Sequence, residues 1–304
     1  MRAVGAELLE HREILPGQWQ QTWHAPAVSA GARPGQFVHL RGIEPGGLPL
    51  RRPFPLVTAD PAAGSVTVQV TVQVPGATTS GAWLGTLRPG DTLDVLGPLG
   101  RPYEVDPRSR HLLLVAEGPS IAGLRFLADQ AVRDGRSVAL LFGAASSAGV
   151  YPSSLLPDEV EYVVATEDGS LGRRGSVADL VLEFEAWADQ SFACGPPALL
   201  ARLAALAVGR RGRLGVATLG RKRGGGRPIA AGSPEARRKA FLQVAIEQSV
   251  GCAAGTCLGC VVQGVDEPVR ACREGPVFAS DELAWPEATL ADETARSAAR
   301  SAAR

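Results

Sequence analysis

The sequence lacks the features of a secreted, membrane-spanning or nucleic-acid-binding protein. Basic and acidic residues are equal in number, 31 of each among 304, so no excess of positive charge favours a nucleic-acid partner. No apolar run approaches the ~18 residues needed to span a bilayer. Residues 1–17 have no apolar core of the signal-peptide type. These absences predict a cytoplasmic protein with neither a membrane nor a nucleic acid as its partner.

Motifs for hydrolysis and for nucleotide triphosphates are also missing. No G-x-S-x-G elbow and no Walker loop is present. The four histidines show no nucleophile or metal-ligand spacing, so no catalytic residue is predicted. Five cysteines are too few for a disulfide scaffold in a chain of this length. Four of them nevertheless fall within 21 residues, and this clustering requires a chemical explanation.

Residues 1–105 have the pattern of a β domain. VTVQVTVQV (66–74) alternates β-branched and polar residues, as a half-buried strand does, and GQFVHL (35–40) predicts another short strand. Proline–glycine turn signals separate the segments. Short strands at this spacing predict an antiparallel barrel.

Residues 106–208 alternate strand and helix signals. HLLLVA (111–116), SVALLFGA (137–144) and EYVVAT (161–166) are apolar runs typical of strands buried on both faces. Helices are expected near 120–134, 176–187 and 197–208. This alternation predicts a parallel sheet with helices on both faces, a Rossmann-like α/β domain.

The last third divides into three parts. Residues 209–239 contain ten basic residues and one acidic residue, are rich in glycine and lack periodicity. They predict a solvated linker or loop, although this charge would also suit an acidic partner surface or a phosphate. Residues 240–290 contain the clustered cysteines, and the low-complexity tail 291–304 is expected to fray. The fold class is therefore multidomain, β followed by α/β and a small C-terminal domain.

The clustered cysteines have the spacing of a 2Fe–2S site. Cys252, Cys257 and Cys260 form C-x4-C-x2-C, and Cys272 follows after eleven residues. Plant-type ferredoxins use this spacing with a distant fourth cysteine. Two irons need four thiolates in one small volume. Glycines in the tight loop allow the sulfurs to point inward and backbone N–H groups to face the cluster, with the fourth ligand on a hairpin ending at Cys272.

Two other interpretations of these cysteines were weighed. Zinc sites usually pair two short C-x2–4-C knuckles, and three crowded cysteines with one apart fit that pattern poorly. A redox C-x-x-C at Cys257 and Cys260 would leave Cys252 and Cys272 unexplained. The spacing favours the cluster because all four positions fit at once.

Three shorter signals indicate nucleotide or flavin binding. Each is weak alone, since an exposed turn or a structural thiol has the same composition. An arginine in LPLRRPFPLV (48–57) could meet a flavin diphosphate, and small residues in PGATTSGAWL (75–84) could cradle a phosphate. TEDGSLG (166–172) and FACGPPALL (192–200) follow predicted strands, at the edge where nucleotides bind in such sheets.

With these motifs in order, the chain resembles the electron-transfer subunit of dihydroorotate dehydrogenase B, in the ferredoxin–NADP reductase superfamily. The likeness covers about residues 8–285, apart from the basic segment. It is carried by PGQFV (34–38), LRRPFPL (50–56), LRPGDTLDVLGPLG (87–100), TEDGSLGRRGSV (166–177), ACGPPALL (193–200) and the cysteine module with REGPVF (273–278).

The resemblance implies an oxidoreductase component that binds FAD in the barrel, NAD in the α/β domain and a 2Fe–2S cluster in the C-terminal domain. It also implies a catalytic flavoprotein partner of the dihydroorotate dehydrogenase type, used in pyrimidine biosynthesis. The implied cluster ligands are Cys252, Cys257, Cys260 and Cys272. The implied cofactor contacts are Arg52, Pro53, Phe54, Pro55, Val70, Thr71, Gly76, Thr78, Thr79 and Ser80 for the flavin, and Glu167, Asp168, Gly169, Cys194, Gly195 and Pro196 for NAD.

Three stretches depart from the family pattern. Pro55 replaces a serine or threonine, and the GATTSGAWL segment is longer than usual. Glu117 and Pro119 stand where a glycine-rich turn is expected next to the diphosphate. A carboxylate repels phosphate and proline lacks a backbone donor. Two alternative functions follow: an electron-input subunit of a transhydrogenase or hydrogenase, and a relative that retains the cluster but has lost NAD.

Overall fold

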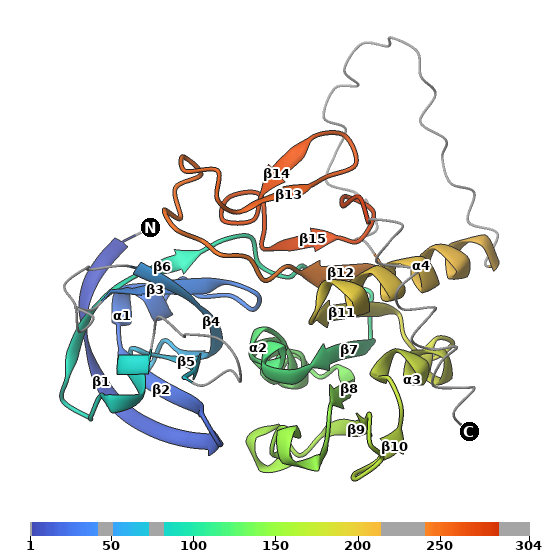
Figure 1. Ribbon diagram of the computed structural model, residues 1–304, viewed down its shortest axis with the longest axis horizontal. Coiled ribbons are helices and arrows are strands. Elements are labelled where there is room, and N and C mark those ends of the chain that lie inside the picture. Colours follow the sequence, from blue (N-terminus) through green and yellow to red (C-terminus); the bar gives the residue numbers. More distant parts are fainter. Residues whose placement is uncertain (1, 42–50, 73–81, 214–240, 286–304) are drawn as a thin grey trace.

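Three structural units lie side by side in a computed structural model (Figure 1). The structure describes residues 2–41, 51–72, 82–213 and 241–285. In Figure 1 the barrel is on the left, the parallel sheet is on the right, and the cysteine module lies above both. None of the described helices combines the length and the apolar character needed to cross a membrane.

The first unit is a closed barrel with strand order β1-β2-β5-β4-β3-β6. All six neighbouring pairs are antiparallel. Alternating residues such as Val66, Val68 and Val70 point inward and pack on Trp23, which is fully buried. The elements are β1 Arg2–Leu15, β2 Gln18–His24, α1 Pro26–Ser29, β3 Phe37–Arg41, β4 Arg51–Asp60, β5 Ser65–Thr71, η1 Ala82–Thr86 and β6 Thr92–Leu99.

The second unit is a seven-stranded sheet with strand order β10-β9-β8-β7-β11-β12-β15. Its strands are parallel except for β15, which runs antiparallel at one edge. The elements are β7 His111–Glu117, η2 Gly118–Ile121, α2 Ala122–Arg133, β8 Ser137–Ala144, η3 Ser147–Gly149, η4 Ser153–Leu155, β9 Val160–Thr166, β10 Arg173–Arg174, α3 Val177–Phe184, β11 Gln190–Cys194 and α4 Pro197–Arg213.

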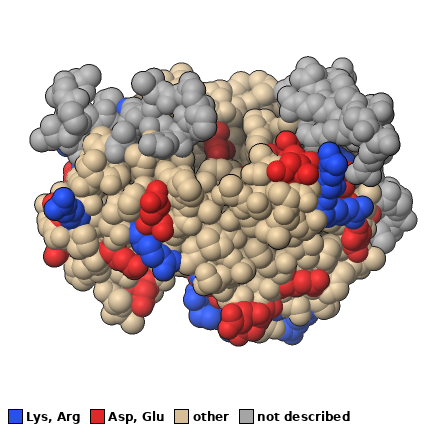
Figure 2. Space-filling view, turned by 60° about the horizontal axis from the view of Figure 1, so that its bottom comes forward, with Lys and Arg blue, Asp and Glu red and all other residues tan. Residues whose placement is uncertain are grey.

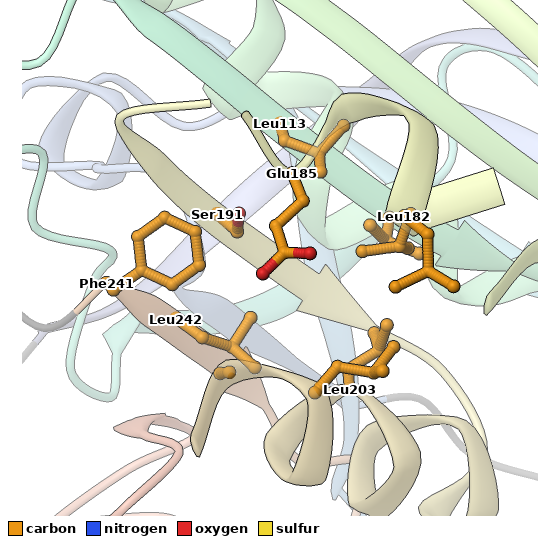
Figure 3. Close-up of a pocket in the computed structure, with 11 residues that line it drawn as sticks. Leu113, Leu182, Glu185, Ser191, Leu203, Phe241 and Leu242 are labelled. Carbon is orange, nitrogen blue, oxygen red and sulfur yellow. The ribbon is translucent and has the colours of Figure 1, made fainter. Parts of the chain in front are cut away.

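Helices cover both faces of this sheet, so its central strands are apolar on both sides. Leu112 and Leu114 on β7 face α2, whereas Leu113 and Val115 face α3 and α4. Phe126 on α2 reaches into the core of the barrel, so one helix packs on both units. Between α3 and α4 is a gap of about 30 Å³ with mainly apolar lining, and Figure 3 shows the Glu185 carboxylate there between Phe241 and Leu182. A gap of this size has room for about one water and none for a cofactor.

The third unit, residues 241–285, extends the parallel sheet. Its strands β12 (Leu242–Ala245) and β15 (Val277–Ala279) are the last two strands of that sheet, and β12 pairs with β11. Phe278 on β15 is buried against α4 side chains. Between these two strands the chain forms the cysteine loop and the hairpin of β13 (Val261–Gln263) and β14 (Pro268–Arg270).

The segment between the barrel and the sheet is fixed by two buried glutamines. The Gln243 side chain accepts the Glu104 N–H at 2.9 Å and donates to the Glu104 carbonyl at 2.5 Å. Gln190 donates to the same carbonyl at 3.0 Å and accepts the Asp106 N–H at 2.9 Å. These bonds satisfy buried backbone groups, which would be costly to leave unpaired, and thereby set the position of the barrel relative to the sheet.

The predicted fold class is confirmed. The strand predicted over 137–144 is β8 with the same limits, and the helices expected near 120–134, 176–187 and 197–208 are α2, α3 and α4. The strand expected over 66–74 is described as β5, Ser65–Thr71, and its predicted end lies outside the described residues. Strand pairing between the cysteine module and the sheet was not expected, because short strands such as β12 and β15 give little periodic signal.

Removing the Phe278 ring should destabilise the protein strongly. Phe278→Ala leaves a cavity between β15 and α4 and is expected to lower the free energy of unfolding by about 3–5 kcal/mol. Urea denaturation followed by tryptophan fluorescence measures the change. Val265→Ala is the control, because Val265 is 59% exposed and its loss should change the free energy by less than about 0.5 kcal/mol. Equal midpoints for the two variants would contradict this packing.

Candidate flavin and iron–sulfur site

A cavity of about 330 Å³ lies where the three units meet. All three units line it, so no single segment of the sequence contains it. A volume of this size is typical of small-molecule sites that form at domain interfaces. The described lining residues are Gly35, Gln36, Phe37, Pro53, Phe54, Pro55, Gln69, Thr71, Pro119, Ala122, Gly123, Cys194, Ala245, Ile246, Glu247, Gln248, Val250, Ala271 and Pro276.

The barrel wall of this cavity comes from β4 and β5. Pro53, Phe54 and Pro55 line it, whereas Arg52 lines an adjoining hollow of about 520 Å³ next to residues 247–251. Thr71 on β5 lines the cavity, whereas the Val70 side chain belongs to the barrel core. The expected contacts at Gly76, Thr78, Thr79 and Ser80 lie outside the described residues.

Gln69 supplies a polar group to the cavity wall. Its amide nitrogen donates to the Pro119 carbonyl at 3.2 Å and to Gln18 Oε1 at 3.3 Å. Its buried Oε1 has no hydrogen-bond partner among the described residues. A buried acceptor without a partner is costly, so this oxygen is suited to accept a hydrogen bond from a bound molecule.

Cys194 and Glu247 meet on the side of the cavity formed by the sheet. The Cys194 thiol at the end of β11 lies 3.8 Å from Glu247 Oε1, in contact range for a weak S–H donor. Burial, and then the Glu247 carboxylate, raise the pKa of this thiol well above its ordinary value. Cys194 is therefore a neutral thiol at physiological pH and not a reactive thiolate.

The four clustered cysteines form two pairs in the structure. Cys252 and Cys257 are within side-chain hydrogen-bonding reach of each other, and so are Cys260 and Cys272. Two pairs of thiols fit two irons, which share four cysteine ligands.

The loop around the first pair directs backbone donors at sulfur. Cys252 Sγ accepts the N–H of Ala254 at 3.4 Å and that of Cys257 at 3.5 Å. The Cys257 N–H, followed by that of Ala254, lowers the pKa of Cys252 to about 5. This geometry requires left-handed backbone at Ala253 and Leu258, with φ of 53° and 58°, as well as at Gly255.

The second pair lies in a more buried setting. Cys260 and Cys272 are buried, whereas Cys257 is exposed. Burial, followed by the neighbouring Cys260, raises the pKa of Cys272 to about 11. Metal binding would displace the proton of Cys272, because only the thiolate form of a cysteine is a metal ligand.

The thiols and the cavity share a wall. Cys260 and Cys272 pack in one apolar cluster with Phe37, Leu99, Val250, Ala253 and Ala271. Phe37, Val250 and Ala271 of this cluster also line the cavity. Ala271 directly precedes Cys272 in the chain, so only a thin layer of protein separates the cysteine loop from the cavity.

The remaining predicted positions lie along the carboxyl edge of the sheet. Glu167, Asp168 and Gly169 form an exposed turn after β9, in which Ser170 N–H donates to the Asp168 carboxylate at 2.9 Å. The hydroxyl of Ser170, followed by its backbone N–H, lowers the pKa of Asp168. Gly195 and Pro196 lie between β11 and α4. Of the six predicted NAD contacts, all of them described, only Cys194 lines the cavity.

Comparison with known proteins identifies the family. Residues 247–284 match the family model described as the iron–sulfur cluster binding domain of dihydroorotate dehydrogenase B. The electron transfer subunit of dihydroorotate dehydrogenase B (NAD(+)) from Bacillus caldolyticus is 31% identical over 281 residues, covering 90% of this chain and 95% of that protein. The chain belongs to this family of electron transfer subunits. The Geobacillus thermodenitrificans subunit is 30% identical, with 91% and 96% covered.

Solved structures agree with this family assignment. A structure of an NADH-dependent reduced ferredoxin-NADP oxidoreductase, described for flavin-based electron bifurcation, has a TM-score of 0.72 and 25% identity, covering 96% of this chain and 93% of that one. A ferredoxin NADP+ reductase from Neisseria gonorrhoeae has a TM-score of 0.56 at 16% identity over 69% of this chain and 92% of that one, which shows the shared fold of barrel and sheet. The resemblance to this family is confirmed, as is the oxidoreductase class.

Several cavity residues were missed by sequence analysis. Gln36, Gln69 and Glu247 stand in the cavity wall but were not predicted as site residues. Glu247 precedes the first clustered cysteine by five residues, and that proximity is the one signal that could have indicated it. Gln69 is a polar residue in the apolar strand β5 and Gln36 directly precedes β3, and such positions become informative only once the opposite wall of the cavity is known.

Replacing one thiol of the first pair should remove the cluster. Cys257→Ser is expected to abolish most bound iron and acid-labile sulfide but leave most of the flavin, because the cavity does not include Cys257. Iron, sulfide and flavin are counted in anaerobically purified protein. Cys194→Ser is the matched control, since Cys194 is the fifth cysteine and pairs with none of the other four. Full iron content in Cys257→Ser would refute the ligand assignment.

Proposed function

We propose that this chain passes electrons between a catalytic flavoprotein partner, a 2Fe–2S cluster on Cys252, Cys257, Cys260 and Cys272, an FAD in the cavity, and NAD. The partner is the dihydroorotate-oxidising subunit, and the process is pyrimidine biosynthesis. The chain binds the two redox groups and contributes no substrate-converting residue of its own. Its task is to position them for electron transfer.

The shared wall between the thiols and the cavity is the observation that carries this proposal. Phe37, Val250 and Ala271 pack with the pair Cys260 and Cys272 and also line the cavity. A cluster and a flavin placed on the two sides of this wall would be separated by single side chains. The wall is apolar, so it excludes water from the space between them.

The cavity fits a flavin ring. Pro53, Phe54 and Pro55 line one side of it, and Gln69 Oε1 is a buried acceptor without a partner among the described residues. Arg52 lies in the adjoining hollow, where its guanidinium could meet a diphosphate. When bound, FAD supplies the conversion between single electrons and a hydride pair.

The cysteine module fits the cluster. Four thiols in two pairs provide the ligands, and the N–H groups of Ala254 and Cys257 partly neutralise the negative charge of the sulfur of Cys252. Such N–H groups stabilise a reduced and more negative cluster and help to set its potential. Cys194 and Glu247 stand at the sheet side of the cavity as a neutral thiol beside a carboxylate.

The cysteine module also offers a surface for the partner. Leu258 is 63% exposed, and Val261 and Val265 of the adjoining hairpin are also exposed. These three are half of the large hydrophobic side chains exposed in the described part of the chain, and they lie in the cysteine loop and in the hairpin that follows it. An apolar patch of this kind is typical of a protein–protein contact. A partner that docks there would bring its own flavin next to the cluster.

The remaining assignments are part of the same proposal. Acidic and basic side chains alternate on the face in Figure 2 without a large area of one sign, which offers no surface for a nucleic acid there. We place the protein in the cytoplasm, because cluster thiols persist in a reducing compartment. The predicted domain limits, 1–105, 106–208, 209–239, 240–290 and 291–304, remain predictions.

A second candidate function is electron input to another oxidoreductase. It is favoured by the likeness to the NADH-dependent reduced ferredoxin-NADP oxidoreductase, which spans 93% of that chain. Affinity purification from the native cell separates the two: recovery of a dihydroorotate-oxidising subunit supports the first function, and recovery of a transhydrogenase or hydrogenase subunit supports the second.

Anaerobic purification followed by an absorption spectrum tests the proposal directly. One FAD, two irons and two acid-labile sulfides per chain are expected, because four thiols bind two irons and the structure has one flavin-sized cavity of this composition among the described residues. Colourless protein with zinc and without iron would overturn the redox function.

Breaking the apolar patch should weaken partner binding. Leu258→Asp places a charge on the most exposed of these three side chains and is expected to weaken association at least tenfold, since buried apolar anchors dominate such contacts. Surface plasmon resonance with the catalytic subunit measures the affinity, and the iron content shows whether the loop is intact. Leu9→Asp, an exposed leucine on β1, is the control and should leave affinity unchanged. Equal affinities for both variants would place the partner elsewhere.

A further inference from the structure

We propose that Arg270 raises the reduction potential of the 2Fe–2S cluster by holding the Gly255 N–H against the sulfur of Cys272. The inference rests on the proposed function, because it concerns the cluster that the four cysteines would bind. Arg270 is not a ligand of the cluster. It is a positioning residue, which acts through the cysteine loop on how readily the cluster accepts an electron.

The side chain of Arg270 is fixed by Glu274, which follows it by four residues. Arg270 Nη2 donates to Glu274 Oε1 at 2.6 Å, and Arg270 Nε donates to Glu274 Oε2 at 3.0 Å. The backbone N–H of Arg270 donates to the same Oε2 at 2.9 Å. Two parallel bonds between a guanidinium and a carboxylate fix the plane of the guanidinium. They therefore also fix the direction of the third nitrogen, Nη1.

This third nitrogen binds the cysteine loop. Arg270 Nη1 donates to the Gly255 carbonyl at 3.1 Å. Gly255 has φ of 77°, and a Cβ there would lie 3.3 Å from Nη1, so the absence of a side chain lets the guanidinium approach the backbone. The N–H of Gly255 lies within hydrogen-bonding reach of Cys272 Sγ. Because both groups belong to one residue, the bond that holds the carbonyl also restricts the direction of this N–H.

The backbone of Arg270 fixes the turn that contains Cys272. The Arg270 carbonyl accepts the N–H of Glu274 at 2.9 Å and closes this turn. The N–H of Ala271 donates to the Cys260 carbonyl at 2.9 Å and joins the turn to the other cysteine of the buried pair. The side chain of Arg270 thus positions the N–H donor, and its backbone positions the sulfur that would accept the bond.

The main effect of Arg270 is geometric, because its charge is compensated by the ion pair with Glu274. An N–H group directed at a ligand sulfur stabilises the reduced, more negative cluster and thereby raises its potential. Loss of Arg270 would free the Gly255 N–H, and the cluster should then accept an electron less readily. The remaining attraction between the guanidinium and the sulfurs acts in the same direction. A lysine retains this charge without the planar fork of nitrogens, so the two effects can be separated.

An anaerobic redox titration of the holoprotein, followed by the EPR signal of the reduced cluster, measures the potential without catalytic turnover. Arg270→Gln removes the fork and the charge. We expect the ratio of reduced to oxidised cluster at a fixed ambient potential to fall at least tenfold, a shift of about 59 mV for one electron. Arg270→Lys retains the charge but cannot bond Glu274 and Gly255 in the same geometry, and it should lower this ratio at least threefold.

Arg273→Gln is the matched control. A Cβ on Gly255 would lie 3.2 Å from Arg273 Cδ, yet Arg273 donates no hydrogen bond to the Gly255 carbonyl in the described part of the chain. The variant removes a positive charge directly after Cys272. It should change the ratio less than twofold, because Arg273 is exposed and its charge is screened. An equal shift in Arg273→Gln and Arg270→Gln, or a wild-type potential in Arg270→Lys, would overturn the inference.

Glu274→Gln decides if both Arg270 variants lose their iron, since it releases the guanidinium and retains its charge. The inference then expects a lower ratio of reduced to oxidised cluster than in the wild type. An unchanged or higher ratio contradicts it, because the loss of a carboxylate would raise the ratio through charge alone. A wild-type protein without iron and acid-labile sulfide would instead refute the proposed function, so the two failures are distinguishable.

Discussion

The pairing of β12 with β11 is the constraint on which the arrangement of this molecule depends. It adds the cysteine-bearing segment to the parallel sheet by backbone hydrogen bonds, and β15 returns the chain to the same edge. Because both ends of the cysteine loop are fixed in one sheet, the loop lies over the joint with the barrel. This pairing therefore places the cavity and the two pairs of thiols at the joint between the barrel and the sheet.

Close approach between units makes the joint possible. Gly35 has φ of 87°, and a Cβ there would lie 2.8 Å from both Tyr103 and Val277, so a side chain would push the barrel away from the sheet. The buried amides of Gln190 and Gln243 bind the connecting segment from the other side. Apolar contact and satisfied polar groups thus cooperate to position one cavity between three units.

The site combines two chemical requirements that often conflict. A cluster needs thiolates and N–H donors, whereas a flavin cavity next to it needs dry apolar walls. The structure separates them by a layer of side chains, including Val250 and Ala271, that serves both.

The sequence alone determined the chemistry of the cysteines and the alternation of strand and helix, because both are encoded in local spacing. The spacing between the cysteines predicts the cluster ligands Cys252, Cys257, Cys260 and Cys272. The apolar run over residues 137–144 predicts β8. The tertiary structure decided which polar residues face the cavity. Gln69 and Glu247 lie far apart in the chain and line the same cavity only because the barrel, the sheet and the cysteine module pack together. The pairing of β12 with β11 is non-local, and a strand as short as β12 has too little periodicity for the sequence to predict it.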